Sequence, residues 1–173
     1  MKTRWNGWLQ ERHGSAEKLA AAWSLKPEAV QWGASQSPAV QDAPGSPELL
    51  EFQQFREELA DAWTRRQVAA IKGADPQALV TGGLIQWSVP SLLGHVRHYS
   101  GFRPARQAKF LDFMEVHFYP LEGGFYTYAD EEAEARNLAY LESVVREVAA
   151  AGKPVVIAEF GWYGGGKPTI EGG

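Results

Sequence analysis

Residues 153–164 read KPVVIAEFGWYG, a short apolar run that ends on a single carboxylate, Glu159. Three β-branched residues open the run and glycines bound it, which predicts a buried strand of the parallel type. The two-residue period of a strand predicts that Val155, Ile157 and Glu159 share one face. Because a carboxylate at such a strand end is costly to bury without partners, Glu159 is a candidate site residue. The alternative is a glutamate that caps a neighbouring helix or pairs with an arginine.

The composition is that of a soluble globular chain. Its 173 residues are 45% hydrophobic and 22% charged, enough for one domain with a core. A net charge of −4 excludes nucleic acid as an expected partner, and no apolar run approaches the roughly 20 residues that span a bilayer. The absence of cysteine excludes disulfides and thiolate metal sites. The 7 tryptophans are typical of proteins that stack a flat ligand or partner.

Two more strands are expected upstream of the first stretch. Residues 78–87 read ALVTGGLIQW, whose glycines mark a place where another backbone or a ligand comes close. Residues 112–119 read DFMEVHFY. Helices are expected at residues 3–13, 15–23, 46–73, 91–99, 105–110 and 130–152, with an irregular segment at 26–47. Strands separated by helices predict parallel crossovers and an α/β layer.

Three strands are too few for a finished parallel α/β fold. Such a sheet needs both faces covered, and an apolar edge strand needs a partner. We therefore expect further strands in an absent part of a longer chain or in a partner. We also expect the isolated chain to self-associate through its edges.

Polar residues share one face of the strand at 112–119. Its period of two places Glu115, His117 and Tyr119 together. If this strand neighbours the one that ends at Glu159, the Tyr119 hydroxyl donates to that carboxylate and keeps it ionised and oriented. His117 then donates to a hydroxyl-rich ligand. The alternative is a set of core polar residues that satisfy one another. Glu115 lies roughly 13 Å below Tyr119 along the strand, so we assign it to a deeper polar layer.

These stretches together resemble the clan A glycoside hydrolases, most closely the family 5 cellulase and mannanase type. KPVVIAEFGWYG (153–164) resembles the clan's seventh-strand nucleophile motif, and DFMEVHFYP (112–120) its sixth strand with His-x-Tyr and Pro. ALVTGGLIQW (78–87) resembles the fifth strand, and residues 46–73 the fourth helix. WLQERHGSAEKLAAAW (8–23) resembles the stretch after the fourth strand, including that of some β-galactosidase-like members.

The resemblance implies a partial (β/α)8 TIM barrel, approximately strands 5 to 7 with flanking helices, and a site at the C-terminal strand ends. Residues 1–173 would form one incomplete domain, with strands 1–4 and 8 outside the chain. It also implies retaining hydrolysis by two carboxylates about 5 Å apart. Glu159 maps onto the nucleophile, Tyr119 onto the tyrosine that hydrogen-bonds it, and His117 onto a substrate-side histidine.

The chain departs from the family pattern at the acid/base. That residue lies in an Asn-Glu pair after the fourth strand, whereas Asn6 and Asn137 are the only asparagines here and neither precedes a glutamate. Of the candidates to replace it, Glu115 belongs to the deeper layer and Glu122 follows the sixth strand. We expect the isolated chain to be inactive, and Met1 to be an internal methionine of a longer reading frame.

Aromatic residues near the strand ends are candidates for stacking on sugar rings. The substrate-binding candidates are Trp162, Tyr163, Trp87 and Tyr126, and the alternative is that such loop aromatics pack on one another. His95 and His98 have the spacing of a metal pair, but no third ligand is in reach by sequence. No metal and no cofactor are therefore expected.

Two functions follow as hypotheses. The first is a retaining β-glycosidase, endo-glucanase- or mannanase-like, that hydrolyses O-glycosidic bonds in β-linked glycans. The alternative is a non-catalytic carbohydrate-binding or assembly fragment that needs a complementary half-barrel. The expected partner is an oligo- or polysaccharide, with no nucleic acid and no membrane. The resemblance favours a secreted protein, whose signal would lie upstream of residue 1.

Overall fold

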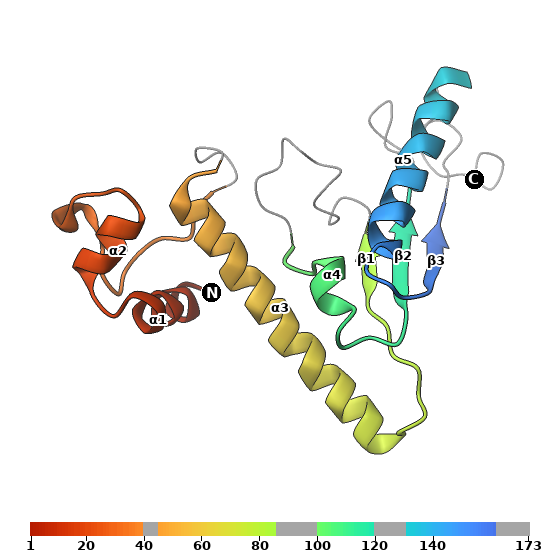
Figure 1. Cartoon of the computed structure of the whole chain (residues 1–173), viewed down its shortest axis with the longest axis horizontal. Coiled ribbons are helices and arrows are strands. Elements are labelled where there is room, and N and C mark those ends of the chain that lie inside the picture. The colour runs from red at the N-terminus through yellow and green to blue at the C-terminus, as the bar shows by residue number, and fades with distance from the viewer. Residues whose placement is uncertain (40–44, 86–99, 120–130, 162–173) are drawn as a thin grey trace, which may run out of the picture. The chain divides into compact units, whose positions relative to one another are not determined.

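A computed structural model describes residues 1–39, 45–85, 100–119 and 131–161 (Figure 1). The chain divides into two compact units. Unit 1 comprises Met1–Ala60 with His95–Gly101, and unit 2 comprises Asp61–Gly94 with Phe102–Gly173. Each unit has its own hydrophobic cluster.

Unit 1 is helical. It contains α1 (Lys2–His13), α2 (Ala16–Ala22), the short 3-10 helix η1 (Pro27–Ala29) and the first part of α3 (Pro47–Ala74). Serine caps fix two of the helix starts, as the sequence predicts. Ser15 accepts a hydrogen bond from the Lys18 backbone N–H, and Ser46 Oγ accepts one from the Leu49 N–H at 3.2 Å.

The core of unit 1 is aromatic. Trp5 is fully buried and stacks on Trp8 and Trp23, with ring centroids 5.5 and 6.4 Å apart. The indole N–H of Trp23 donates to Glu51 at 2.7 Å, which satisfies the polar edge of a largely buried ring. These three tryptophans therefore serve packing, whereas the composition of the chain had pointed to ligand stacking.

Unit 2 is built on a three-stranded parallel sheet of order β1-β2-β3 (Figure 1). The strands are β1 (Gly83–Ile85), β2 (Met114–Phe118) and β3 (Val155–Phe160), and the helices are the end of α3, α4 (Pro104–Gln107) and α5 (Glu131–Ala149). The predicted parallel α/β arrangement is thus confirmed for these strands. β1 begins at Gly83, later than the start of the strand expected at 78–87, and residues 86–87 lie outside the described ranges.

One face of this sheet carries the core of unit 2. Met114 and Val116 of β2 are fully buried and pack with Val144 and Val148 of α5. α5 ends at Ala149, and Gly152 in the turn that follows has a φ of 77°, the left-handed conformation that favours glycine. The opposite face of β2 is left for polar side chains.

Candidate active site

The strand period places three polar side chains on the face of β2 that points away from α5. Burial alternates along Met114–Phe118, with the apolar residues buried and Glu115 and His117 partly exposed. Tyr119 follows the strand with the same parity. The predicted grouping of these three residues on one face is therefore confirmed.

The pairing of β2 with β3 contains a register shift that moves Glu159 to this face. Val116 is paired with Ile157, but the next residue, His117, is paired with Glu159, so Ala158 is the extra residue of a bulge. Paired residues of parallel strands point to the same side of the sheet. The prediction that Val155, Ile157 and Glu159 share one face is therefore wrong, because the bulge reverses the alternation just before the carboxylate.

A side chain of β2 and one from the residue just after it hold the Glu159 carboxylate. Nδ1 of His117 lies 2.7 Å from Oε2 of Glu159, and the Tyr119 hydroxyl donates to Oε1. Each carboxylate oxygen thus contacts one donor group, which fixes the plane of the carboxylate. The Glu159 side chain remains 51% exposed. Since an ionised carboxylate has about four acceptor positions, lone pairs remain for a ligand.

Glu115 joins the same network through the other side of the imidazole. Its Oε1 lies 2.8 Å from Nε2 of His117. The assignment of Glu115 to a separate, deeper layer is therefore wrong. Residues two apart on one face are only about 6.6 Å apart along a strand, and the long glutamate side chain spans that gap to the ring.

Two glycines leave the space in which these side chains lie. A Cβ on Gly83 of β1 would stand 2.9 Å from Nε2 of His117, and a Cβ on Gly161 would stand 2.8 Å from Cε1 of Tyr119. Both distances are too short for a real contact. The glycine pair in the strand at 78–87 had signalled a close approach, and the approaching group is the His117 ring. The role of Gly161 beside Tyr119 was not predicted.

Several predicted site residues lie outside the described residues. These are Trp162, Tyr163, Trp87 and Tyr126 among the substrate-binding candidates, with Glu122, His95 and His98. The described ranges hold no cluster of three or more histidine, cysteine, aspartate or glutamate side chains arranged to bind a metal ion. Within the same ranges, no helix combines the length and apolarity that crossing a bilayer would require.

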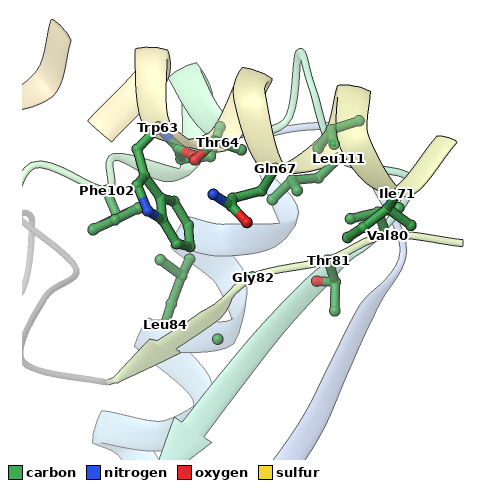
Figure 2. Close-up of a pocket in the computed structure, with 13 residues that line it drawn as sticks. Trp63, Thr64, Gln67, Ile71, Val80, Thr81, Gly82, Leu84, Phe102 and Leu111 are labelled. Carbon is green, nitrogen blue, oxygen red and sulfur yellow. The ribbon is translucent and has the colours of Figure 1, made fainter. Parts of the chain in front are cut away.

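A pocket of about 290 Å³ lies elsewhere in unit 2, between α3 and β1 (Figure 2). Trp63 and Phe102 form one wall, with ring centroids 5.7 Å apart and ring planes nearly perpendicular. Its lining contains no aspartate, glutamate, histidine, lysine or arginine. Because it offers no group for acid–base or nucleophilic chemistry, the carboxylate cluster on β2 and β3 remains the candidate active site.

Comparisons with known proteins agree with the glycosidase resemblance. A family model described as beta-galactosidase (Glyco_hydro_42) matches residues 1–161. Among solved structures, a beta-galactosidase from the psychrophilic Marinomonas ef1 has a TM-score of 0.64 and 16% identity, covering 92% of this chain and 24% of its own. An exo-beta-agarase has a TM-score of 0.53 and 19% identity, covering 90% and 18%. No curated protein matches the sequence.

The family match refines the resemblance. The chain spans about a quarter of the length of the first of these structures. The match supports the clan A glycoside hydrolases but not family 5. The two strand motifs carried the likeness to the clan, whereas residues 8–23 had pointed to β-galactosidase-like enzymes. Over residues 1–161 the chain belongs to the Glyco_hydro_42 family of glycoside hydrolases, described as beta-galactosidase.

Proposed function

We propose that this chain is the nucleophile-bearing part of a retaining β-glycosidase that acts on β-galactosides. The observation that carries the proposal is the half-exposed Glu159 carboxylate, held on both oxygens by His117 and Tyr119. Such a group is oriented without being covered, as attack on a sugar requires. The family description favours a β-galactoside over the glucan or mannan expected from the sequence.

In the proposed reaction, one Glu159 oxygen bonds to the anomeric carbon as the bond to the leaving oxygen breaks. The result is a glycosyl ester, which water then hydrolyses with net retention of configuration. The leaving oxygen needs a proton from a second carboxyl group about 5 Å from the first. Glu115 is engaged by His117 on the far side of the ring. We assign the acid/base to a segment outside this sequence, which has no Asn-Glu pair.

We also propose that the sheet of unit 2 is a sector of a (β/α)8 barrel. Val156, Ile157 and Phe160 of β3 are 45%, 39% and 77% exposed, an apolar surface that further structure would cover. β1 forms the opposite edge of the sheet. The apolar pocket beside β1 is a space that further structure next to that strand would fill (Figure 2). Parallel sheets of this type are stable when both faces and both edges are covered.

The nucleophile can be tested apart from the acid/base. A 2,4-dinitrophenolate leaves without a proton, so 2,4-dinitrophenyl 2-deoxy-2-fluoro-β-galactoside needs only the nucleophile to form a glycosyl ester, and the fluorine slows hydrolysis of that ester. We expect the full chain to gain one fluorogalactosyl group, and peptide mass spectrometry to place it on Glu159.

Two variants control this experiment. Glu159→Gln should abolish labelling while leaving the unfolding midpoint nearly unchanged, because the side chain is half exposed. Glu134→Gln removes an exposed carboxylate from α5 of the same unit and should label like the wild type. Labelling of another residue, or equal labelling of Glu159→Gln, would refute the assignment.

A further inference from the structure

His117 lies between two carboxylates, and only one of them is the proposed nucleophile. Nδ1 faces Glu159 at 2.7 Å and Nε2 faces Glu115 at 2.8 Å. The Glu115 side chain is 21% exposed, against 51% for Glu159. Glu115 is thus the inner member of a carboxylate–imidazole–carboxylate line whose outer member is open to a ligand.

The number of protons on the His117 ring determines how the ring can contact the two carboxylates. A neutral imidazole carries one N–H, which is on either Nδ1 or Nε2. If only Nε2 were protonated, the lone pair of Nδ1 would face an ionised Glu159 oxygen at hydrogen-bond distance, which is repulsive. An ionised Glu159 therefore requires a proton on Nδ1, and the 2.8 Å contact to Glu115 then has room for a second proton on Nε2.

We propose that Glu115 is a positioning residue that keeps His117 doubly protonated, so that an imidazolium donates to Glu159 through Nδ1. This inference rests on the proposed role of Glu159 for its functional meaning, but the protonation of His117 is a property of the resting chain. Glu115 acts through His117, since its contact is with the ring nitrogen remote from Glu159.

The arrangement has a consequence for the reaction cycle. When Glu159 becomes a glycosyl ester, it loses its negative charge and His117 loses one of its two counter-charges. Glu115 remains paired with Nε2, so the proton stays on the ring. When water releases the sugar, the returning Glu159 carboxylate faces a donor that is already in place.

The surroundings of His117 fit this role. The titratable side chains that share its face among the described residues are Glu115 of β2, Tyr119 just after β2 and Glu159 of β3. β1 contributes Gly83, which carries no charge. Because Gly83 has no Cβ, the His117 ring fits beside it; a Cβ there would stand 2.9 Å from Nε2. A side chain there would force the His117 ring away from Glu115, because its Cβ would clash with Nε2, the atom that contacts Glu115, while Oε1 of Glu115 at 3.5 Å would stay at ordinary contact distance.

The first test reads the protons directly. The full chain is labelled with ¹⁵N-histidine, and long-range ¹H–¹⁵N spectra are recorded at pH 7, with His117→Asn identifying the His117 signals. We expect both ring nitrogens of His117 to be protonated in the wild type. In Glu115→Gln, whose amide can donate to a bare Nε2, we expect only Nδ1 to be protonated.

The second test reads the effect on the nucleophile. The rate of labelling by the activated fluorogalactoside is measured against pH for wild type, Glu115→Gln and the control Glu142→Gln, which removes an exposed carboxylate of α5. The imidazolium charge is nearer to Glu159 than the Glu115 charge is, so its loss should move the acid limb of the profile to higher pH. The control should overlay the wild type.

Gly83→Ala provides an independent route to the same result. It keeps all three ionisable groups but forces the ring away from Glu115, so it should change the spectra and the profile as Glu115→Gln does. A far-ultraviolet spectrum matching the wild type's shows that each variant is folded. A singly protonated His117 in the wild type, or unchanged spectra in Glu115→Gln, would overturn the inference. Since the spectra need no turnover, they decide it even if the chain is not labelled and the proposed function fails.

Discussion

A carboxylate lies near each end of β2, and each is held by hydrogen-bond donors of a different kind. One is held partly by the backbone and the other by side chains. At the N-terminal end, Asp112 Oδ2 accepts a hydrogen bond from the Val80 backbone N–H at 2.8 Å and pairs with Lys72 Nζ at 2.8 Å. The Asp112 N–H donates in return to the Val80 carbonyl at 2.9 Å. At the C-terminal end, the described residues that hold Glu159 do so with side chains, those of His117 and Tyr119.

This difference separates a structural carboxylate from a reactive one. The contacts of Asp112 tie β2 to the segment that leads into β1, and Lys72 joins them by donating to the Ala78 carbonyl at 2.5 Å. A ligand at Asp112 would have to break backbone hydrogen bonds. A ligand at Glu159 would break none of the backbone hydrogen bonds of the described residues, because His117 and Tyr119 contact the carboxylate through side chains. In parallel α/β folds the C-terminal strand ends are where ligands bind.

The largest expected effect comes from moving a donor at the C-terminal end without removing it. In Gly161→Ala the new methyl group would meet the Tyr119 ring at 2.8 Å and push the hydroxyl away from Glu159. The displaced ring would also shift the Glu159 carboxylate, and misplacing a reacting group by about 1 Å costs roughly 100-fold in rate, so we expect the rate of fluorogalactosyl labelling to fall about that far. Stopped-flow release of dinitrophenolate measures this rate.

Gly73→Ala is the matched control for Gly161→Ala. A Cβ on Gly73 of α3 would meet nothing within 4 Å, and alanine favours the helix by up to about 1 kcal/mol. It should therefore label at the wild-type rate and unfold at equal or higher urea concentration. Wild-type labelling by Gly161→Ala would mean that the position of Tyr119 does not matter to Glu159.

A smaller effect is expected from removing one donor outright. Tyr119→Phe deletes the hydroxyl that donates to Glu159, and a hydrogen bond to a charged group contributes about 1.5 kcal/mol, or roughly tenfold in labelling rate. Tyr140→Phe is the control, since the Tyr140 hydroxyl is buried without a hydrogen-bond partner in the described part of the chain. Equal labelling rates in these two variants would contradict the assigned role of Tyr119.

The sequence predicted the features of the two strand ends that depend on composition and on the order of strands and helices along the chain. Three β-branched or aromatic runs separated by helices gave parallel strands, and neighbouring parallel strands bring their C-terminal ends together. That rule placed Tyr119 near Glu159, but their contact also depends on the bulge that turns Glu159 to the face of Tyr119. The helix starts expected at residues 15 and 46 are also confirmed, because the serine caps found there depend on a few adjacent residues.

What the sequence did not predict depends on pairing between distant segments. The bulge at Ala158 cannot be predicted from the six strand-forming residues of β3, because it is defined by their pairing with β2. The inclusion of Glu115 depends on the reach of its side chain to His117, which strand spacing alone does not give. Likewise, only the packing against α3 reveals that Trp5 and Trp23 belong to a core rather than a ligand site.

The smallest expected effect lies at the N-terminal end of β2 and concerns stability. Asp112→Asn removes the charge that pairs with Lys72 but keeps an oxygen for the Val80 N–H. The hydrogen bond from Lys72, followed by that from Val80, lowers the pKa of the Asp112 carboxyl below its usual value. A carboxylate with a pKa lowered by folding stabilises the fold above its unfolded pKa of about 3.9. That contribution is lost as the pH falls through the lower, folded value.

Thermal unfolding at several pH values therefore separates the two ends of β2. We expect Asp112→Asn to melt below the wild type at pH 6, and the two melting curves to converge as the pH falls below about 3.9, where the wild-type charge is lost too. Its labelling rate at neutral pH should stay within about twofold of the wild type, because Asp112 makes none of the contacts that hold Glu159. A melting difference that persists in acid would assign the stabilisation to hydrogen-bond geometry rather than to charge. A large loss of labelling would mean that the two ends of the strand are coupled, and the separation of structural and reactive carboxylates would fail.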